Sequence, residues 1–213
     1  MEMIPQAIMA AYDTETTGLP NKKLPMTHKE QPHIVQLATV LYKSDGTELG
    51  TFDMIIKPDG YTEMPIKAFE AHGITFERAM DEGVDRKIVL DAWKDFVRPA
   101  KLMVAHNNWF DKQLLDINMR RTYNDIKQSY RYKKYFCTMQ TYMPICKLPA
   151  TEKMLRYGFG PYKNPTLTEV HEFLFGEGFE GAHNALEDVR AVGKVFFKLP
   201  LSVRESAFSG KDK

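Results

Sequence analysis

The stretch that decides the fold is AIMAAYDTETTGL, residues 7–19. An apolar run typical of a buried strand ends there in two carboxylates, Asp13 and Glu15, and Gly18 marks a turn just beyond them. Side chains two residues apart on a strand point to the same face, so we expect both carboxylates to project together at the strand's C-terminal end. Adjacent carboxylates repel each other unless a cation lies between them, and all-oxygen ligands suit Mg²⁺ or Mn²⁺. The alternative is an acidic turn that follows a buried strand.

Length and composition predict one domain and a reducing environment. The 213 residues are 43% hydrophobic, which is enough for a full core, so we predict a single domain over residues 1–200 and a polar, frayed C-terminal tail over 201–213. We see no signal peptide and no stretch near the ~20 apolar residues of a membrane span. Cys137 and Cys146 are too few for a disulfide framework or a four-ligand zinc site, so a cytoplasmic setting without membrane association is expected.

The order of the predicted elements is typical of an α/β fold with a mixed sheet. Two strands around the turn at residues 44–47 form a hairpin, and strands and helices alternate after it. The predicted strands span residues 33–42, 49–57, 102–105 and 136–139. The predicted helices span 65–72, 84–98, 140–147 and 184–198; one more follows the segment 106–111 and ends near 121, and another is capped by Thr168 and ends at 175. Residues 151–165 are predicted to be a long loop. In such sheets, sites gather at strand ends and helix starts.

Two further segments carry acids at such places. In HNNWFD, residues 106–111, Asn108 can cap the following helix with Asp111 as its capping-box partner. In GAHNALED, residues 181–188, Asn184 suits the N-cap and Glu187 the capping box, which leaves Asp188 unexplained by capping. His183 precedes this helix in a glycine-flanked segment. Taken singly, each segment has a structural explanation.

Taken together, the three segments resemble the DEDDh exonuclease family, also called DnaQ-like, which has a ribonuclease H-like fold. The pattern is Asp-x-Glu after a strand, Asn-x-x-Phe-Asp at a strand–helix junction and His-x-x-x-x-Asp at a helix start, and it spans residues 8–197. The segments TTGL (16–19), HGIT (72–75) and CTM (137–139) add weaker matches. The related DEDDy group carries a tyrosine in place of the histidine, so His183 indicates the DEDDh form. The resemblance implies an α/β, ribonuclease H-like mixed five-stranded sheet flanked by helices.

The resemblance also implies an activity. Such enzymes remove nucleoside 5′-monophosphates from nucleic-acid 3′ ends, here single-stranded or frayed ends, with DNA as the expected substrate. Two Mg²⁺ or Mn²⁺ ions would be held by Asp13, Glu15, Asp111 and Asp188, and would flank the scissile phosphate. His183 would take a proton from the attacking water.

Substrate contacts are expected at two places near the motifs and in one basic segment. Thr16, Thr17 and Leu19 match the family segment that contacts the terminal nucleotide, and Asn107 or Asn108 would also touch the substrate.

The net charge of +1 conceals an excess of basic residues in one segment. Residues 112–163 hold 11 Lys and Arg against 3 Asp and Glu, an excess of +8, so the rest of the chain carries −7. Within it, residues 120–134 interleave basic residues with tyrosines, which suits phosphate contact and base stacking. We name Arg131, Lys133 and Lys134 as candidates, and the alternative is a solvated helix face.

Three other functions stay open at this point. The first is a 3′–5′ exoribonuclease resembling oligoribonuclease or ribonuclease T. The second is a proofreading subunit that acts with a separate polymerase, and a homodimer is also possible. The third is a metal-binding structural module without turnover, although such a module has no need of a general base.

Overall fold

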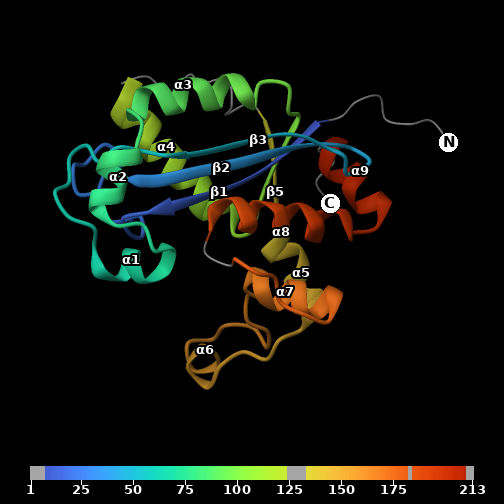
Figure 1. Ribbon diagram of the computed structural model, residues 1–213. Helices are drawn as coiled ribbons and strands as arrows, with labels where there is room; N and C mark the ends of the chain where they lie inside the picture. The colour runs from blue at the N-terminus through green and yellow to red at the C-terminus, as the bar shows by residue number, and fades with distance from the viewer. Residues whose placement is uncertain (1–7, 124–132, 182–183, 210–213) are drawn as a thin grey trace.

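The structure is a computed structural model, and it describes residues 8–123, 133–181 and 184–209. Within these ranges, five strands form one sheet in the order β3-β2-β1-β4-β5 (Figure 1). Strand β2 pairs antiparallel with β1 and β3, whereas β4 runs parallel to β1 and β5. The strands are β1 (Ile8–Thr16), β2 (Ile34–Lys43), β3 (Glu48–Ile55), β4 (Leu102–Ala105) and β5 (Lys134–Cys137). The mixed five-stranded sheet predicted from the sequence is therefore confirmed.

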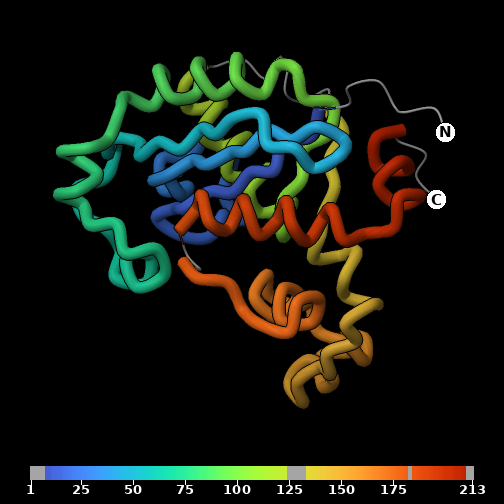
Figure 2. Tube along the Cα trace, turned by 45° about the vertical axis from the view of Figure 1, so that its right-hand side comes forward, coloured from blue at the N-terminus to red at the C-terminus, as the bar shows by residue number. Residues whose placement is uncertain are grey.

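Helices cover both faces of this sheet. Helices α3 (Arg86–Phe96) and α4 (Asn108–Tyr123) pack on one face, and α8 (Ala185–Phe197) lies along the other. Figure 2 shows α5, α6 and α7 grouped beyond α8, away from the sheet. The remaining helices are α1 (Ile66–His72), α2 (Phe76–Glu82), α5 (Thr138–Cys146), α6 (Glu152–Arg156), α7 (Leu167–Phe175) and α9 (Leu201–Ser209). In the described ranges, no helix has the length and apolar composition that a bilayer crossing requires.

The alternation of side chains along β1 determines what each face receives. Ala10 and Tyr12 belong to the core under α3 and α4, whereas Met9 and Ala11 belong to the core under α8. All four residues are 0% exposed. A shift of the β1 register by one residue would move each of these side chains to the opposite face of the sheet. The register therefore determines that Asp13 and Glu15, which continue the row of Met9 and Ala11, face the start of α8.

Three local predictions were wrong. Strand β5 spans Lys134–Cys137 instead of 136–139, because a four-residue strand takes its register from β4, where Leu102 pairs with Lys134. Helix α7 is capped by Thr166 instead of the predicted Thr168, because Thr166 forms a capping box with Glu169. The loop predicted for 151–165 contains the short helix α6, which Thr151 caps by accepting from the backbone N–H of Met154.

The C-terminal segment also differs from the polar, frayed tail expected for residues 201–213. Residues 201–209 form α9, and three of its apolar side chains pack against the core under α8. These are Val203, Ala207 and Phe208. The segment shows little helical periodicity in its apolar residues, so its local pattern does not indicate a packed helix.

Candidate active site

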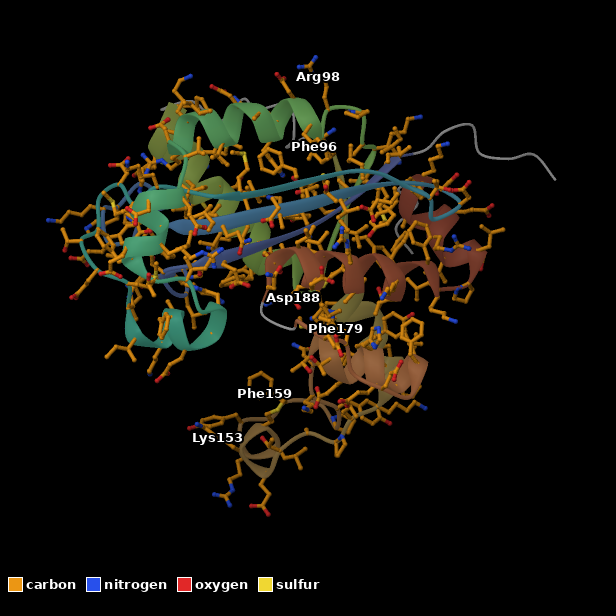
Figure 3. All side chains as sticks on the ribbon, in the orientation of Figure 1. Phe96, Arg98, Lys153, Phe159, Phe179 and Asp188 are labelled. Atoms are coloured by element: carbon orange, nitrogen blue, oxygen red, sulfur yellow. The ribbon has the colours of Figure 1, made fainter. Side chains whose placement is uncertain are left out.

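Three carboxylates meet where β1 ends and α8 begins. Asp13 and Glu15 of β1 lie close to Asp188 in the first turn of α8. Figure 3 labels Asp188 near the start of that helix. Each of the three offers an oxygen atom, and these oxygens all lie within 4.8 Å of one another. The predicted convergence of the first and third motifs is thus present in the structure.

The burial and close spacing of these carboxylates favour the binding of a cation. Desolvation, followed by repulsion from the neighbouring acids, raises the pKa of Asp13 well above its usual range. The same causes raise the pKa of Glu15 to about 8. Close carboxylates that resist ionisation become stable anions when a divalent cation neutralises them, and carboxylate oxygens are the ligands that Mg²⁺ and Mn²⁺ prefer. The donor set therefore fits the predicted metals.

The fourth acid, Asp111, lies in the first turn of α4 on the opposite side of β1. Its carboxylate is 1% exposed, and its Oδ1 accepts hydrogen bonds from the backbone N–H of Thr14 at 3.0 Å and from the Thr14 hydroxyl at 2.9 Å. Burial raises the pKa of Asp111 to about 7, although the hydrogen bonds from Thr14 act in the opposite direction. Repulsion from Asp111 also raises the pKa values of Asp13 and Glu15, so the four acids form one electrostatic group.

The capping box predicted for Asn108 and Asp111 was wrong. Helix α4 already includes Asn108, and Asn107 before it has a left-handed backbone with φ of 71°. The side chain of Asn108 accepts a hydrogen bond of 2.6 Å from the buried hydroxyl of Tyr12. The back face of β1, through Tyr12 and Thr14, therefore holds the first turn of α4, and Asp111 is positioned by the sheet instead of by a cap.

The start of α8 matches the sequence in one respect and differs in another. Asn184 is the N-cap and accepts from the backbone N–H groups of Leu186 and Glu187. Glu187 does not complete a capping box, because its carboxylate pairs with Arg190 at 2.8 Å. His183, the predicted general base, lies outside the described residues.

A cavity of about 780 Å³ opens beside the acids, and we call it the substrate cavity. It is lined by the end of β1, the following loop and α1. The predicted contacts Thr16, Thr17 and Leu19 all line it, and Leu19 is 81% exposed. Across it lies Ile66 of α1, which is 76% exposed. Our sequence reasoning did not identify Ile66, because an apolar residue in the first turn of a short helix is usually a core residue.

The structure does not bring the predicted contacts Asn107, Asn108, Lys133 and Lys134 to this cavity. Asn107 and Asn108 do not line it, and the amide oxygen of Asn108 is engaged by Tyr12. Lys134 of β5 pairs with Leu102 of β4, and Leu102 in turn pairs with Met9 of β1. Met9 precedes Asp13 by four residues, so Lys134 lies about 13 Å from Asp13 along the strand direction.

Two lysines at the end of the basic segment form hydrogen bonds within the chain. Lys133 donates to the carbonyls of Arg98 and Ala100, and Lys134 donates to that of Phe208. Their ammonium groups thus join chain segments at the end of the sheet away from the acids, and their contact with substrate stays a prediction. Arg131 lies outside the described residues.

Comparison with known proteins agrees with the fold and with the motifs. Residues 10–196 match the RNase T family, which is described as exonuclease. A search of curated proteins found no match.

Solved exonucleases share the fold at low sequence identity. A structure of E. coli exonuclease I with a dA16 oligonucleotide has a TM-score of 0.69 and 18% identity, and the match covers 96% of this chain and 43% of that chain. The nuclease domain of 3′hExo bound to rAMP, a DEDDh family member, has a TM-score of 0.65 and 17% identity, and covers 97% of this chain and 94% of its own. The chain thus spans less than half the length of exonuclease I. Because the family match covers most of the sequence and the DEDDh acids of β1 and α8 meet in space, this chain belongs to the RNase T exonuclease family of DEDDh type.

Proposed function

We propose that this protein is a 3′–5′ exonuclease that hydrolyses the terminal phosphodiester bond of single-stranded or frayed 3′ ends and releases nucleoside 5′-monophosphates. The observation that carries the proposal is the convergence of Asp13, Glu15 and Asp188 within 4.8 Å, at the edge of a cavity large enough for a nucleotide. DNA is the expected substrate and RNA is the alternative. We further propose a single exonuclease domain over residues 1–200, which α9 continues, and a cytoplasmic location.

Two divalent cations would be held by Asp13, Glu15, Asp111 and Asp188. When bound, they would supply Lewis acidity at the scissile phosphate and lower the pKa of a water molecule. Thr14 keeps Oδ1 of Asp111 occupied with two hydrogen bonds, which fixes the orientation of that carboxylate. His183 would accept the proton of the attacking water.

The substrate cavity supplies the positioning. Leu19 and Ile66 offer exposed apolar side chains to the terminal base, and burying them against it would stabilise the bound 3′ end. The Thr16 hydroxyl bonds the carbonyl of Gly18 at 2.9 Å, and the Thr17 hydroxyl accepts from the backbone N–H of His33 at 2.9 Å. The loop that carries Leu19 is therefore held in place before substrate arrives.

The ligands of the related structures support a nucleic-acid substrate and leave its type open. The structure of E. coli exonuclease I contains a dA16 oligonucleotide and that of 3′hExo contains rAMP. Another similar structure is described as 3′-end specific recognition of a histone mRNA stem-loop by a 3′-exonuclease. One fold thus accommodates both sugars, so the substrate of this chain must be measured.

The test uses matched DNA and RNA oligomers that carry the label at either the 5′ or the 3′ end. With Mg²⁺ or Mn²⁺, we expect 5′-labelled strands to shorten stepwise and 3′-labelled strands to release labelled mononucleotide from the first time point. EDTA should stop both. Internal fragments that keep the 3′ label would contradict the proposal, and the faster of the two polymers identifies the substrate.

A further inference from the structure

A second cavity lies behind the loop that carries Leu19, and we call it the rear cavity. Its volume is about 460 Å³, within the range of pockets that hold small ligands. Thr17, Gly18 and Leu19 line both the rear cavity and the substrate cavity. The opposite wall consists of residues 29–33 with Gly60 and Tyr61. The two cavities are thus neighbours that share this loop and also Glu63 and Pro65.

The wall of the rear cavity is held rigidly from behind. The Gln31 side chain is 2% exposed, and its amide donates to the carbonyls of Asn21 and Leu24 while its oxygen accepts from the N–H of Asn21. The Arg121 guanidinium of α4 donates to the carbonyls of Gln31 at 2.7 Å and Pro32 at 3.1 Å. A ligand would therefore meet a preformed wall, which lowers the entropy lost on binding.

His33 lines the rear cavity with unused hydrogen-bonding capacity. The residue is 7% exposed, and its ring lies 4.9 Å from the ring of Tyr61. Neither ring nitrogen hydrogen-bonds to any residue that the structure describes. Gly60 permits this placement, because a Cβ there would lie 3.2 Å from the imidazole and its φ is +90°. Among the described residues that line this cavity, the Tyr61 hydroxyl is buried and has no hydrogen-bond partner. Such a group costs roughly 1–3 kcal/mol, which a ligand can recover.

The charges around the rear cavity select the chemistry of that ligand. Desolvation, followed by the positive charge of Arg121 and Arg86, lowers the pKa of His33 to about 4. The imidazole is then neutral at neutral pH and offers one donor and one acceptor. Glu30 and Glu63 also line the cavity, against Lys29 alone, so a phosphate is disfavoured there. Carboxylates accept hydrogen bonds from the amino groups of bases.

We propose that the rear cavity is a second nucleobase subsite, which takes an amino-bearing base of the bound strand other than the 3′-terminal one. The unpartnered His33 imidazole, the aromatic ring of Tyr61 and the carboxylates at the wall fit an adenine, cytosine or guanine. This inference rests on the proposed exonuclease function, since it assumes that a strand enters the substrate cavity. The proposal predicts that the protein contacts the base of one nucleotide upstream of the 3′ end, and that it does not contact the bases of the nucleotides on either side of it.

The test is an abasic scan of oligodeoxyadenylate in an Asp13→Asn background, with affinity measured by fluorescence anisotropy. We expect one non-terminal abasic position to weaken binding about tenfold, in keeping with the worth of a single base contact. Thymine at that position should also bind more weakly than adenine. His33→Leu should remove this penalty, whereas His33→Gln, which keeps a neutral donor and acceptor, should retain it. The penalty at the terminal position should be the same in all three proteins.

A second measurement does not depend on the folding of His33→Leu. In the Asp13→Asn protein, the imidazole ¹⁵N signals of His33 should shift when the adenine strand is added and stay unchanged with the abasic strand. Penalties that are equal in His33→Leu, or unchanged ¹⁵N signals, would overturn the subsite. If the wild type shortens strands while the scan shows no His33-dependent position, only the subsite fails. If it neither binds nor shortens them, the proposed exonuclease function fails as well.

Discussion

Thr14 shows how one residue can serve two faces of a strand. Its neighbours Asp13 and Glu15 point toward α8, while its own hydroxyl and N–H bind Oδ1 of Asp111 on the other side. The four-acid arrangement thus depends on a side chain that would itself touch no metal. In sequence, Thr14 has no evident role, because the Asp-x-Glu pattern leaves the middle position free.

Replacing this hydroxyl tests its importance. Thr14→Val keeps the shape of the side chain and removes one of the two donors to Asp111, so we expect Mn²⁺ affinity to fall about 10–100-fold, as for other groups that orient a metal-binding side chain. Thr14→Ser retains the hydroxyl and is the matched control. Isothermal titration calorimetry with Mn²⁺ measures the difference, and equal affinities for Thr14→Val and wild type would contradict the positioning role.

His183 is the residue whose role rests on the sequence alone. A general base contributes roughly 10²–10⁴-fold to a rate, whereas metal and substrate binding need only the acids and the cavity. His183→Ala should therefore keep Mn²⁺ and oligonucleotide affinity near wild-type values and lose turnover by that factor. The decisive comparison is single-turnover cleavage at saturating metal and strand. Wild-type turnover by a folded His183→Ala protein would remove the base assignment.

Among the elements, α8 carries an acid of the site and depends on close packing against the sheet. Gly193 is the point of closest approach, since a Cβ there would lie 2.8 Å from the Cζ and the hydroxyl of Tyr42 on β2. Alanine in a helix normally gains about 1 kcal/mol over glycine, but overpacking a core costs typically 1–3 kcal/mol. The clash should prevail and move α8, and Asp188 with it.

We accordingly expect Gly193→Ala to lower the free energy of unfolding and to weaken Mn²⁺ binding. Chemical denaturation of the wild type, Gly193→Ala and the double variant Gly193→Ala/Tyr42→Leu separates packing from helix propensity. The double variant should recover part of the stability lost in the single one, because it frees the space that the new methyl group needs. A Gly193→Ala protein more stable than wild type would show that propensity outweighs packing here.

The elements that were predicted wrongly share a physical cause. Asn108 and Asp111 have the spacing of a capping box, but their side-chain oxygens accept hydrogen bonds from buried hydroxyl groups on β1 instead of from the helix backbone. Glu187 is drawn to Arg190 in the same way. The position of β5 depends on the register of a neighbouring strand, and α9 depends on a core built by distant residues. Local patterns cannot reveal such long-range partners.

For the whole molecule, the order of the motifs carried most of the prediction. The three acid-bearing segments lie far apart in the chain, and parallel pairing of β1 with β4 together with the packing of α8 brings them to one end of the sheet. Leu19 was predicted beside them, and lines the substrate cavity. The cavity's other wall could not be foreseen, because the placement of α1 depends on tertiary contacts instead of on a residue pattern.

The burial of Glu15, together with repulsion from the neighbouring acids, predicts how stability varies with pH. Glu15 has a pKa of about 8 when folded and 4.5 as its ordinary value, so the native state holds its proton more tightly. The contribution of Glu15 to the free energy of unfolding is therefore fully favourable below about pH 4.5, and it is lost as the pH rises through about 8. In EDTA, Glu15→Gln should match wild type near pH 4.5 and melt higher at pH 8, with about 2–4 °C for each kcal/mol relieved.

Adding metal provides the control for that prediction. Mg²⁺ or Mn²⁺ should raise the melting temperature of the wild type most at high pH, where the carboxylates are ionised, and should raise that of Glu15→Gln less. Differential scanning fluorimetry across the pH range measures both effects. A difference in melting temperature between the two proteins that does not change with pH, with or without metal, would show that Glu15 is not destabilised by ionisation in this cluster.

The central claim is that the acids at the end of β1 and the start of α8 form a metal-dependent catalytic centre, and Asp13→Asn tests it most directly. The control is Asp95→Asn, because Asp95 lies on α3 over the opposite face of the sheet and pairs with Arg98 in an exposed ion pair. The measurement is the rate at which a 5′-labelled strand shortens in saturating Mg²⁺, for proteins shown by melting to be folded. We predict wild-type rates for Asp95→Asn and no detectable shortening for Asp13→Asn, whereas undiminished shortening by Asp13→Asn would contradict the account.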